Sequence, residues 1–169
     1  AQICRWTFNY LKDGKKLTEE PFSMTPKDLN MVSNIKKMIE LGVNSFKIEG
    51  RMRSIYYVST VILTYRRLID KILNGTITLE DEKYALKVLN RVANRDSAPQ
   101  FFDSIPDEND QYYLGREELS NQDFLGLVID FEDEYTIVEE RNFFEVGSRV
   151  EIFGPNHETI EYTIDEMWD

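Results

Sequence analysis

The stretch Ser45-Phe46-Lys47-Ile48-Glu49-Gly50-Arg51-Met52-Arg53 decides how the first part of the chain is interpreted. Apolar side chains alternate here with Lys47 and Glu49, which predicts a β-strand over residues 43–49. Such a strand would direct both charged side chains to one face near its carboxyl end, where α/β enzymes place their sites. We therefore expect Lys47 and Glu49 to be catalytic groups that face a pocket. The alternative is a surface edge strand with solvated charges.

Basic and aromatic residues follow this strand, after a glycine that permits a close approach of the backbone. Guanidinium groups are planar donors suited to carboxylate or phosphate, and a tyrosine beside them could stack on a base. The residues expected to bind substrate are Arg51, Arg53, Tyr57, Arg66 and Arg95. The alternative is that the tyrosines are half-buried packing residues and the arginines are solvated.

The surrounding sequence predicts alternating strands and helices. Residues 21–24 form a short extended run. Thr25-Pro26-Lys27-Asp28 has the features of a helix start, with Thr as N-cap and Pro at the first helical position, and Gly42 would end that helix. Two further helices are expected over about 54–73 and 79–93. This order is typical of α/β architecture.

Beyond the helices the pattern changes to short strands. Residues 105–123 are acidic, rich in turn residues and without periodicity, which predicts a linker between one unit at 1–104 and another at 124–169. Strands separated by tight turns are expected in the second unit, over 124–129, 135–138, 149–153 and 159–164. They predict a small antiparallel sheet or barrel.

Charge divides the chain at about the same place. Residues 1–104 carry 17 Lys and Arg against 12 Asp and Glu, whereas residues 105–169 carry 3 against 19. A nucleic-acid partner should therefore meet the first segment, and the acidic segment is interpreted as a solvated surface. No apolar run approaches the roughly 18 residues of a membrane-spanning helix, so no membrane partner is expected. A single cysteine and the lack of a signal peptide indicate a cytoplasmic protein.

Motifs of familiar hydrolases and metal enzymes are missing from the sequence. It holds no G-x-S-x-G, no H-E-x-x-H and no phosphate-binding glycine loop. The one histidine, His157, lies in an expected turn, and a nucleophile pair would have to join it to Cys4. Cys4 alone cannot build a metal site, because such sites need about four ligands. These residues do not form a complete active site by themselves.

Several blocks of the sequence resemble the U32 (collagenase-like) peptidase family. They are Ala1-Gln2-Ile3-Cys4-Arg5-Trp6 against the end of its G-x-C-A-Q-x-C-R motif, Ser23-Met24-Thr25-Pro26-Lys27-Asp28-Leu29 against N-S-K-D-L, and Gly42 through Arg53 against G-[IV]-x-S-[LF]-K-I-E-G-R-M-[KR]. Three further residue pairs match the family at the expected positions: Tyr57-Val58, Tyr65-Arg66 and Asn94-Arg95. Residues 143–155 resemble the family's C-terminal β-barrel. The chain is therefore identified as similar to the C-terminal portion of a U32 enzyme.

The resemblance implies an α+β fold, with the last strand–helix units of a (β/α) barrel in residues 1–104 and an incomplete, small antiparallel β-barrel in 124–169. It also implies that the intact protein takes part in tRNA uridine hydroxylation, forming 5-hydroxyuridine by a prephenate-derived pathway, with tRNA meeting the basic first segment. Some family members carry an iron–sulfur cluster, and Cys4 matches one cysteine of the motif. No cofactor is expected in this segment itself, because the motif's other cysteine would precede Ala1 and Asn30 stands where relatives often have Cys.

Two other functions stay open at this point. The family is catalogued as peptidases, so the intact protein could be a collagenase-like hydrolase, although no nucleophile, base or metal set is evident. Alternatively, the β-rich part could be a non-catalytic module that binds a protein or RNA. We expect the 169-residue chain to be catalytically inactive alone and to form a homodimer through uncovered half-barrel faces.

Overall fold

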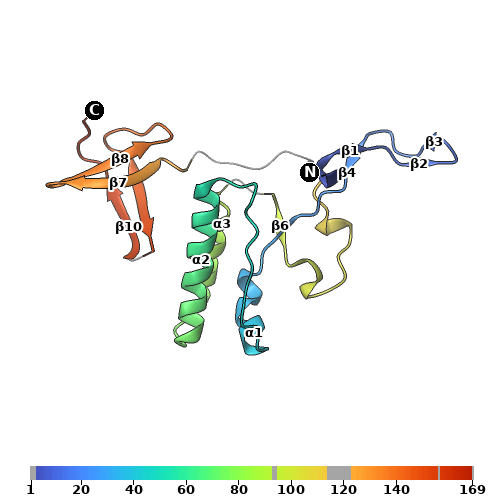
Figure 1. Ribbon diagram of the computed structural model, residues 1–169, viewed down its shortest axis with the longest axis horizontal. Helices are drawn as coiled ribbons and strands as arrows, with labels where there is room; N and C mark the ends of the chain where they lie inside the picture. Colours follow the sequence, from blue (N-terminus) through green and yellow to red (C-terminus); the bar gives the residue numbers. More distant parts are fainter. Residues whose placement is uncertain (1–2, 93–94, 114–122, 156, 169) are drawn as a thin grey trace.

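The computed structural model describes residues 3–92, 95–113, 123–155 and 157–168. The helices lie at the centre, a hairpin extends at one end and the C-terminal strands lie at the other (Figure 1). The first elements are β1 (Thr7–Phe8), β2 (Leu11–Lys12), β3 (Lys15–Lys16), β4 (Phe22–Ser23), β5 (Asp28–Leu29), α1 (Ile35–Glu40), α2 (Ile55–Leu73), α3 (Leu79–Leu89) and β6 (Ser97–Ala98). Short 3-10 helices are Ile3–Arg5, Val32–Asn34, Gln100–Phe102 and Glu108–Asp110. Ala1, Gln2, Asn94 and residues 114–122 of the expected linker lie outside the described residues.

The two long helices begin where the sequence predicted, although α3 ends at Leu89 rather than at about residue 93. Ser54 is the N-cap of α2, and its side chain accepts a hydrogen bond from the backbone N–H of Tyr57 at 3.1 Å. Thr78 begins α3 with a capping box in which Asp81 bonds back to the Thr78 backbone. Each cap satisfies N–H groups that a helix start would otherwise leave without partners. The sequence around each helix start therefore predicted correctly where α2 and α3 begin.

The helix predicted to begin at Thr25 is wrong. Regular helix begins only at Ile35, after a 3-10 turn, and Asp28–Leu29 is instead strand β5, which pairs in parallel with β6. Thr25 is fully buried, and its hydroxyl donates to the Cys4 carbonyl at 3.0 Å rather than capping a helix. Pro26 forms an antiparallel bridge with Gln111. Pairing with distant segments has overridden a local helix-start pattern.

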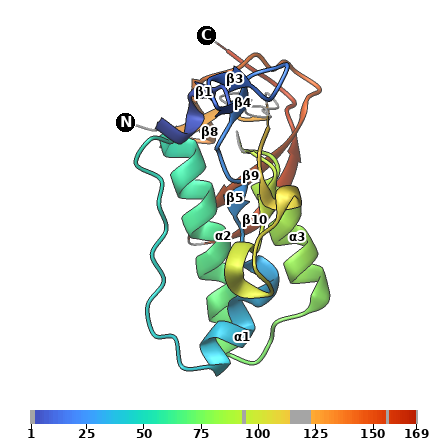
Figure 2. The same cartoon turned by 90° about the vertical axis from the view of Figure 1, so that its right-hand side faces the viewer.

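The strand predicted over residues 43–49 is also wrong. In the described structure these residues are irregular, and they run as an extended connection from α1 to the start of α2, visible beside the helices in Figure 2. Lys47 and Glu49 are both exposed. A β-strand exists through hydrogen bonds to a neighbouring strand, and the described residues place none beside this segment. Apolar and charged side chains still alternate along the segment. Without a sheet, however, neither set has a buried face to point towards.

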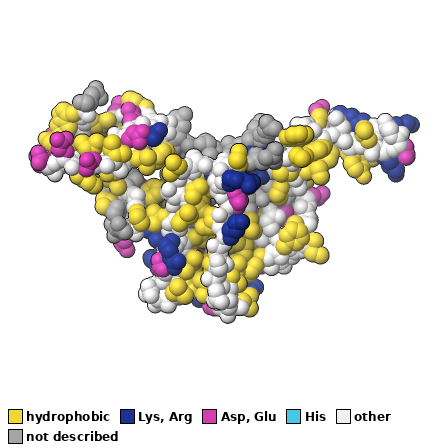
Figure 3. Space-filling model, viewed as in Figure 1, with side chains coloured by type: hydrophobic (Ala, Val, Ile, Leu, Met, Phe, Trp, Pro, Cys, Tyr) yellow, Lys and Arg dark blue, Asp and Glu magenta, His cyan; other side chains and the backbone are white. Residues whose placement is uncertain are grey.

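A small core lies between α2, α3 and the 3-10 turn before α1. Its buried members are Val32, Val61, Leu68, Ala85 and Leu89. Many apolar side chains remain exposed around it, which Figure 3 shows as broad apolar areas over the helices. Among the described residues, no helix combines the length and apolar character needed to cross a membrane.

The C-terminal part consists of two antiparallel hairpins, as the sequence predicted. The strands are β7 (Gly126–Glu132), β8 (Tyr135–Glu140), β9 (Arg149–Gly154) and β10 (His157–Thr163). β7 pairs with β8 and β9 pairs with β10, each pair with one irregularity in its register. Within the described residues the two pairs do not join, so no closed barrel is present. The fold is mixed helix and strand, which confirms the α+β class.

The C-terminal hairpins contact the helices through specific polar and aromatic pairs. Arg91 at the end of α3 donates two hydrogen bonds to the Glu151 carboxylate, at 2.6 and 2.8 Å. Tyr56 of α2 stacks on Phe124 with ring centroids 4.1 Å apart. Arg67 of α2 donates to the Gly154 carbonyl at 2.8 Å. These contacts hold the C-terminal part against the helices.

The Arg91–Glu151 pair makes the stability of this contact between the hairpins and the helices depend on pH. The two hydrogen bonds from Arg91 hold the pKa of the Glu151 carboxyl below its ordinary value. A carboxyl whose pKa is lowered on folding contributes stability above its unfolded pKa of about 4.3, and that stability is lost as pH falls through the folded pKa. We expect the difference in unfolding free energy between the wild type and Glu151→Gln to be largest near pH 6 and to shrink as the pH falls below the ordinary carboxyl pKa. Urea unfolding across that range measures it; a difference independent of pH would contradict this prediction.

Candidate functional site

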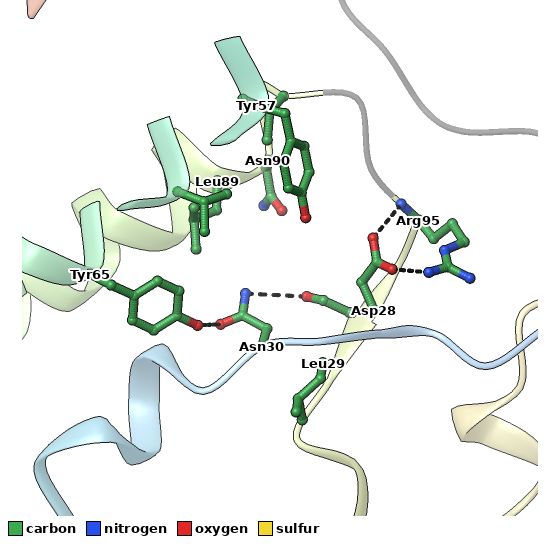
Figure 4. A pocket seen from close by; sticks show the side chains of 11 residues that line it. Asp28, Leu29, Asn30, Tyr57, Tyr65, Leu89, Asn90 and Arg95 are labelled. Atoms are coloured by element: carbon green, nitrogen blue, oxygen red, sulfur yellow. Dashed lines mark hydrogen bonds and ion pairs between the residues drawn. The ribbon is translucent and has the colours of Figure 1, made fainter. Parts of the chain in front are cut away.

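Asp28 lies at the centre of a group of charged residues drawn from three segments. Its carboxylate accepts a hydrogen bond from Arg53 at 2.9 Å. It accepts a second from Arg95, which Figure 4 shows. The exposed fractions of the three side chains are only 17%, 12% and 15% for Asp28, Arg53 and Arg95. Two guanidinium groups therefore share one largely covered carboxylate.

Pairing of β5 with β6 places Asp28 beside Arg95. The Asp28 N–H donates to the Asp96 carbonyl at 2.9 Å, and the Asn30 N–H donates to the Ala98 carbonyl at 3.1 Å. The Arg95 backbone N–H also donates to the Asp28 carboxylate, and its guanidinium donates to the Pro26 carbonyl at 3.2 Å. The parallel pairing of β5 with β6 thus brings together Asp28 and Arg95, which are 67 residues apart in sequence.

Arg53 reaches Asp28 from the segment that leads into α2. Its backbone N–H donates to the Gly50 carbonyl at 2.9 Å, which closes a turn just before the N-cap Ser54. The Arg53 guanidinium also lies over the Tyr57 ring, 4.7 Å from its centroid. A cation over an aromatic face is attracted by the ring's electron density. The Tyr57 ring, in the first turn of α2, therefore helps to hold the Arg53 guanidinium in place.

A pocket adjoins these residues, and its polar floor comes from Asn30 and Tyr65 (Figure 4). The Asn30 side-chain oxygen accepts from the Val32 N–H at 3.0 Å and from the Tyr65 hydroxyl at 3.4 Å. The Tyr65 hydroxyl in turn accepts from the Met31 N–H at 2.9 Å. Burial raises the pKa of Tyr65, so its hydroxyl stays protonated at neutral pH. This network fixes the chain direction between β5 and the following turn.

Chemically, this arrangement suits an anion. Arginine forks match the geometry of phosphate and carboxylate. In addition, Nε of Arg95 is buried without a hydrogen-bond partner among the described residues. We name Asp28, Arg53, Tyr57 and Arg95 the Asp28 cluster.

The structure brings together three of the predicted substrate-binding residues, Arg53, Tyr57 and Arg95. Sequence reasoning missed Asp28, which was interpreted as an acid in the first turn of a helix. The sequence around Asp28 carried no local indication of its partners. Only the parallel pairing with β6 reveals them.

The other predicted site residues lie outside the Asp28 cluster. Lys47, Glu49 and Arg51 are exposed on the connection before α2, where Glu49 accepts a hydrogen bond from the Arg51 backbone at 2.9 Å. Arg66 is exposed on α2 and pairs with Asp70 one turn away. Their proposed roles in catalysis and binding stay predictions.

Gly50 is placed where the connection passes closest to α2. A Cβ added there would lie 2.7 Å from Cγ2 of Val58, closer than side chains tolerate. We expect Gly50→Ala to lower the free energy of unfolding by about 1–3 kcal/mol, because overpacking displaces the backbone. The cost should shrink in a Val58→Ala background, where the clashing methyl is gone. Urea denaturation of both single variants and the double variant measures this; equal costs in the two backgrounds would show that the close approach is unimportant.

The surroundings of Cys4 show whether the residues of this chain fit an iron–sulfur cluster. It is an exposed thiol, and its carbonyl is occupied by hydrogen bonds from Ser23 and Thr25. Among the described residues, no group of three or more potential ligands is gathered for a metal ion. Cluster ligation by cysteine takes about four thiolates. This chain supplies one and does not by itself fit the cluster.

Comparison with known proteins identifies relatives for the whole chain. The model of Peptidase family U32 matches residues 1–112, and that of the Peptidase family U32 C-terminal domain matches residues 120–169. No solved structure matches the chain.

Three curated relatives show the range of names among similar proteins. The tRNA hydroxylation protein P1 of Bacillus subtilis is 40% identical over 178 residues, covering 100% of this chain and 42% of the relative. A collagenase of Porphyromonas gingivalis is 30% identical over 173 residues, covering 99% and 47%. The tRNA hydroxylation protein P of Escherichia coli is 28% identical over 148 residues, covering 86% and 32%. The chain thus spans less than half the length of each of these relatives.

Proposed function

This chain belongs to Peptidase family U32, and from that premise we propose that the intact protein takes part in the hydroxylation of uridine in tRNA. The proposal is supported by the relatives named for tRNA hydroxylation, one of which aligns with the full chain at 40% identity. The observation in this structure that carries it is the Asp28 cluster, where two arginines and a tyrosine gather beside a pocket. Such a cluster offers guanidinium donors to a phosphate.

Within this proposal the Asp28 cluster positions the RNA, and the exposed connection before α2 carries the predicted catalytic residues. Lys47 and Glu49 lie on that connection, a few residues before Arg53. Arg51 and Arg66 are proposed as further substrate contacts. We also propose that this chain is inactive alone.

The same premise extends to architecture and environment. We propose that further strands complete a (β/α) barrel and cover apolar side chains exposed near the cluster, such as Leu29, Val43 and Ile48. The paired hairpins β7–β8 and β9–β10 would be parts of a small β-barrel. An iron–sulfur cluster, if the intact protein carries one, would take Cys4 as one ligand. The cytoplasm is the proposed compartment because tRNA is the proposed substrate.

The test is nucleoside mass spectrometry of tRNA from cells that lack the gene. The 5-hydroxyuridine content should fall to the detection limit and return when the intact protein is supplied on a plasmid. Supplying only residues 1–169 of this chain should not restore it. Unchanged 5-hydroxyuridine in the deletion strain would refute the proposed function.

A second candidate function is peptide hydrolysis, which the relative named collagenase favours. Purified intact protein would then cleave gelatin, and Lys47→Gln or Glu49→Gln would remove that activity. The described residues gather no group of metal ligands, which is why we place this function second. Cleavage that survives both substitutions would point to a contaminating protease.

A further inference from the structure

The β2–β3 hairpin is a basic arm outside the core. Leu11 pairs with Lys16 and Lys12 pairs with Lys15, and the two strands are joined by Asp13-Gly14. Both turn residues have positive φ, 51° and 78°, as a two-residue type I′ turn requires. The hairpin extends away from the helices at the end of the molecule opposite the C-terminal strands, and Lys and Arg side chains gather at its tip (Figures 1 and 3).

The positive charges of the hairpin destabilise it. Lys12 and Lys15 lie directly opposite each other, where side chains on paired strands are about 5 Å apart at Cβ and like charges repel. Neither lysine forms an ion pair with an acidic residue in the described part of the chain, and Lys16 donates only to the Glu19 carbonyl, at 2.8 Å. An isolated two-stranded hairpin is marginal in water even without such repulsion. A bound polyanion would relieve it.

Exposed rings accompany the lysines. Tyr10, at the base of the hairpin, is 58% exposed, and its carbonyl accepts from the Leu17 N–H at 2.9 Å, which extends the ladder. Trp6 is 50% exposed just before β1. Cationic groups that follow a backbone, next to rings on which bases stack, are the general features of sequence-tolerant binding to single-stranded nucleic acid.

We propose that the β2–β3 hairpin binds the phosphate backbone of the substrate RNA through Lys12, Lys15 and Lys16, with Tyr10 beside them as a stacking surface. The inference rests on the proposed function and gives the basic first segment a specific contact. Lysine heads are compact charges suited to phosphate, and phosphate contacts position an RNA without reading its sequence. The hairpin is thus a second RNA contact, separate from the Asp28 cluster.

The experiment measures binding of unmodified tRNA to the intact protein by fluorescence anisotropy, from about 50 to about 200 mM salt. Lys12→Gln/Lys15→Gln should weaken binding by about 10- to 100-fold at low salt and reduce the slope of log K against log salt by about 2, one unit per lost phosphate contact. Asp13→Asn should act oppositely, tightening binding by about 2- to 3-fold, because Asn-Gly keeps the turn while removing the hairpin's acidic charge.

The matched control is Lys83→Gln/Lys87→Gln, which removes the same charge from the exposed surface of α3 and should leave the slope unchanged. Equal slopes for the hairpin variant and the wild type would overturn the inference, as would a loss of slope in the control of equal size. A hairpin variant that binds tRNA normally but loses self-association would instead assign the arm to the acidic segment of a second copy, and would also overturn it. Normal 5-hydroxyuridine in the deletion strain, with the slope still reduced, would refute only the proposed function.

Discussion

Replacing Asp28 by Asn is expected to lower the free energy of unfolding by about 3 kcal/mol, because two largely covered guanidinium groups would lose their shared counter-charge. Asn has nearly the same shape, so the loss reports charge and hydrogen bonding rather than packing. Arg53 and Arg95 would then face each other across a neutral amide, with side chains only 12% and 15% exposed. Urea unfolding at neutral pH, followed by circular dichroism, measures the change.

The control for Asp28 is Asp70→Asn. Asp70 pairs with Arg66 on the exposed face of α2, where both side chains are more than half exposed. Exposed ion pairs contribute little, so this substitution should leave the unfolding midpoint unchanged within error. Similar midpoint shifts for the two aspartates would show that the Asp28 cluster is only a surface ion pair.

The second large effect is expected on RNA modification. Arg53→Lys and Arg95→Lys, each in the intact protein, should reduce 5-hydroxyuridine formation by about 100-fold, because lysine keeps the charge but loses the planar fork that positions substrate. Each arginine holds a carboxylate with one part of its guanidinium, and Arg53 also covers the Tyr57 ring. Mass spectrometry of tRNA from complemented deletion strains gives the readout.

Arg141→Lys serves as the matched control for these variants. Arg141 is exposed in the C-terminal part and pairs with Glu139, far in sequence from the Asp28 cluster. Modification should continue at the wild-type level. If Lys47→Gln or Glu49→Gln abolishes modification while Arg53→Lys does not, the site lies on the exposed connection and our assignment of the Asp28 cluster is wrong.

Elements with strong local determinants could be predicted from the sequence. The N-caps Ser54 and Thr78 began α2 and α3 where expected, since capping depends on residues within one turn of the helix start. The C-terminal hairpins followed from short alternating runs separated by turn residues, because a hairpin pairs neighbours in sequence. Residues Arg53, Tyr57 and Arg95 were expected in the site for the chemistry of their side chains.

The sequence by itself therefore determined the mixed helix and strand class, the two long helices and the local hairpins of this chain. Only the tertiary structure decided that residues 43–49 are not a strand, that no helix begins at Thr25, and that Asp28 joins Arg53 and Arg95. The physical reason is the same in each case. A strand, a parallel pairing or an ion pair between distant segments depends on a partner that lies elsewhere in the chain, and local periodicity contains no information about that partner.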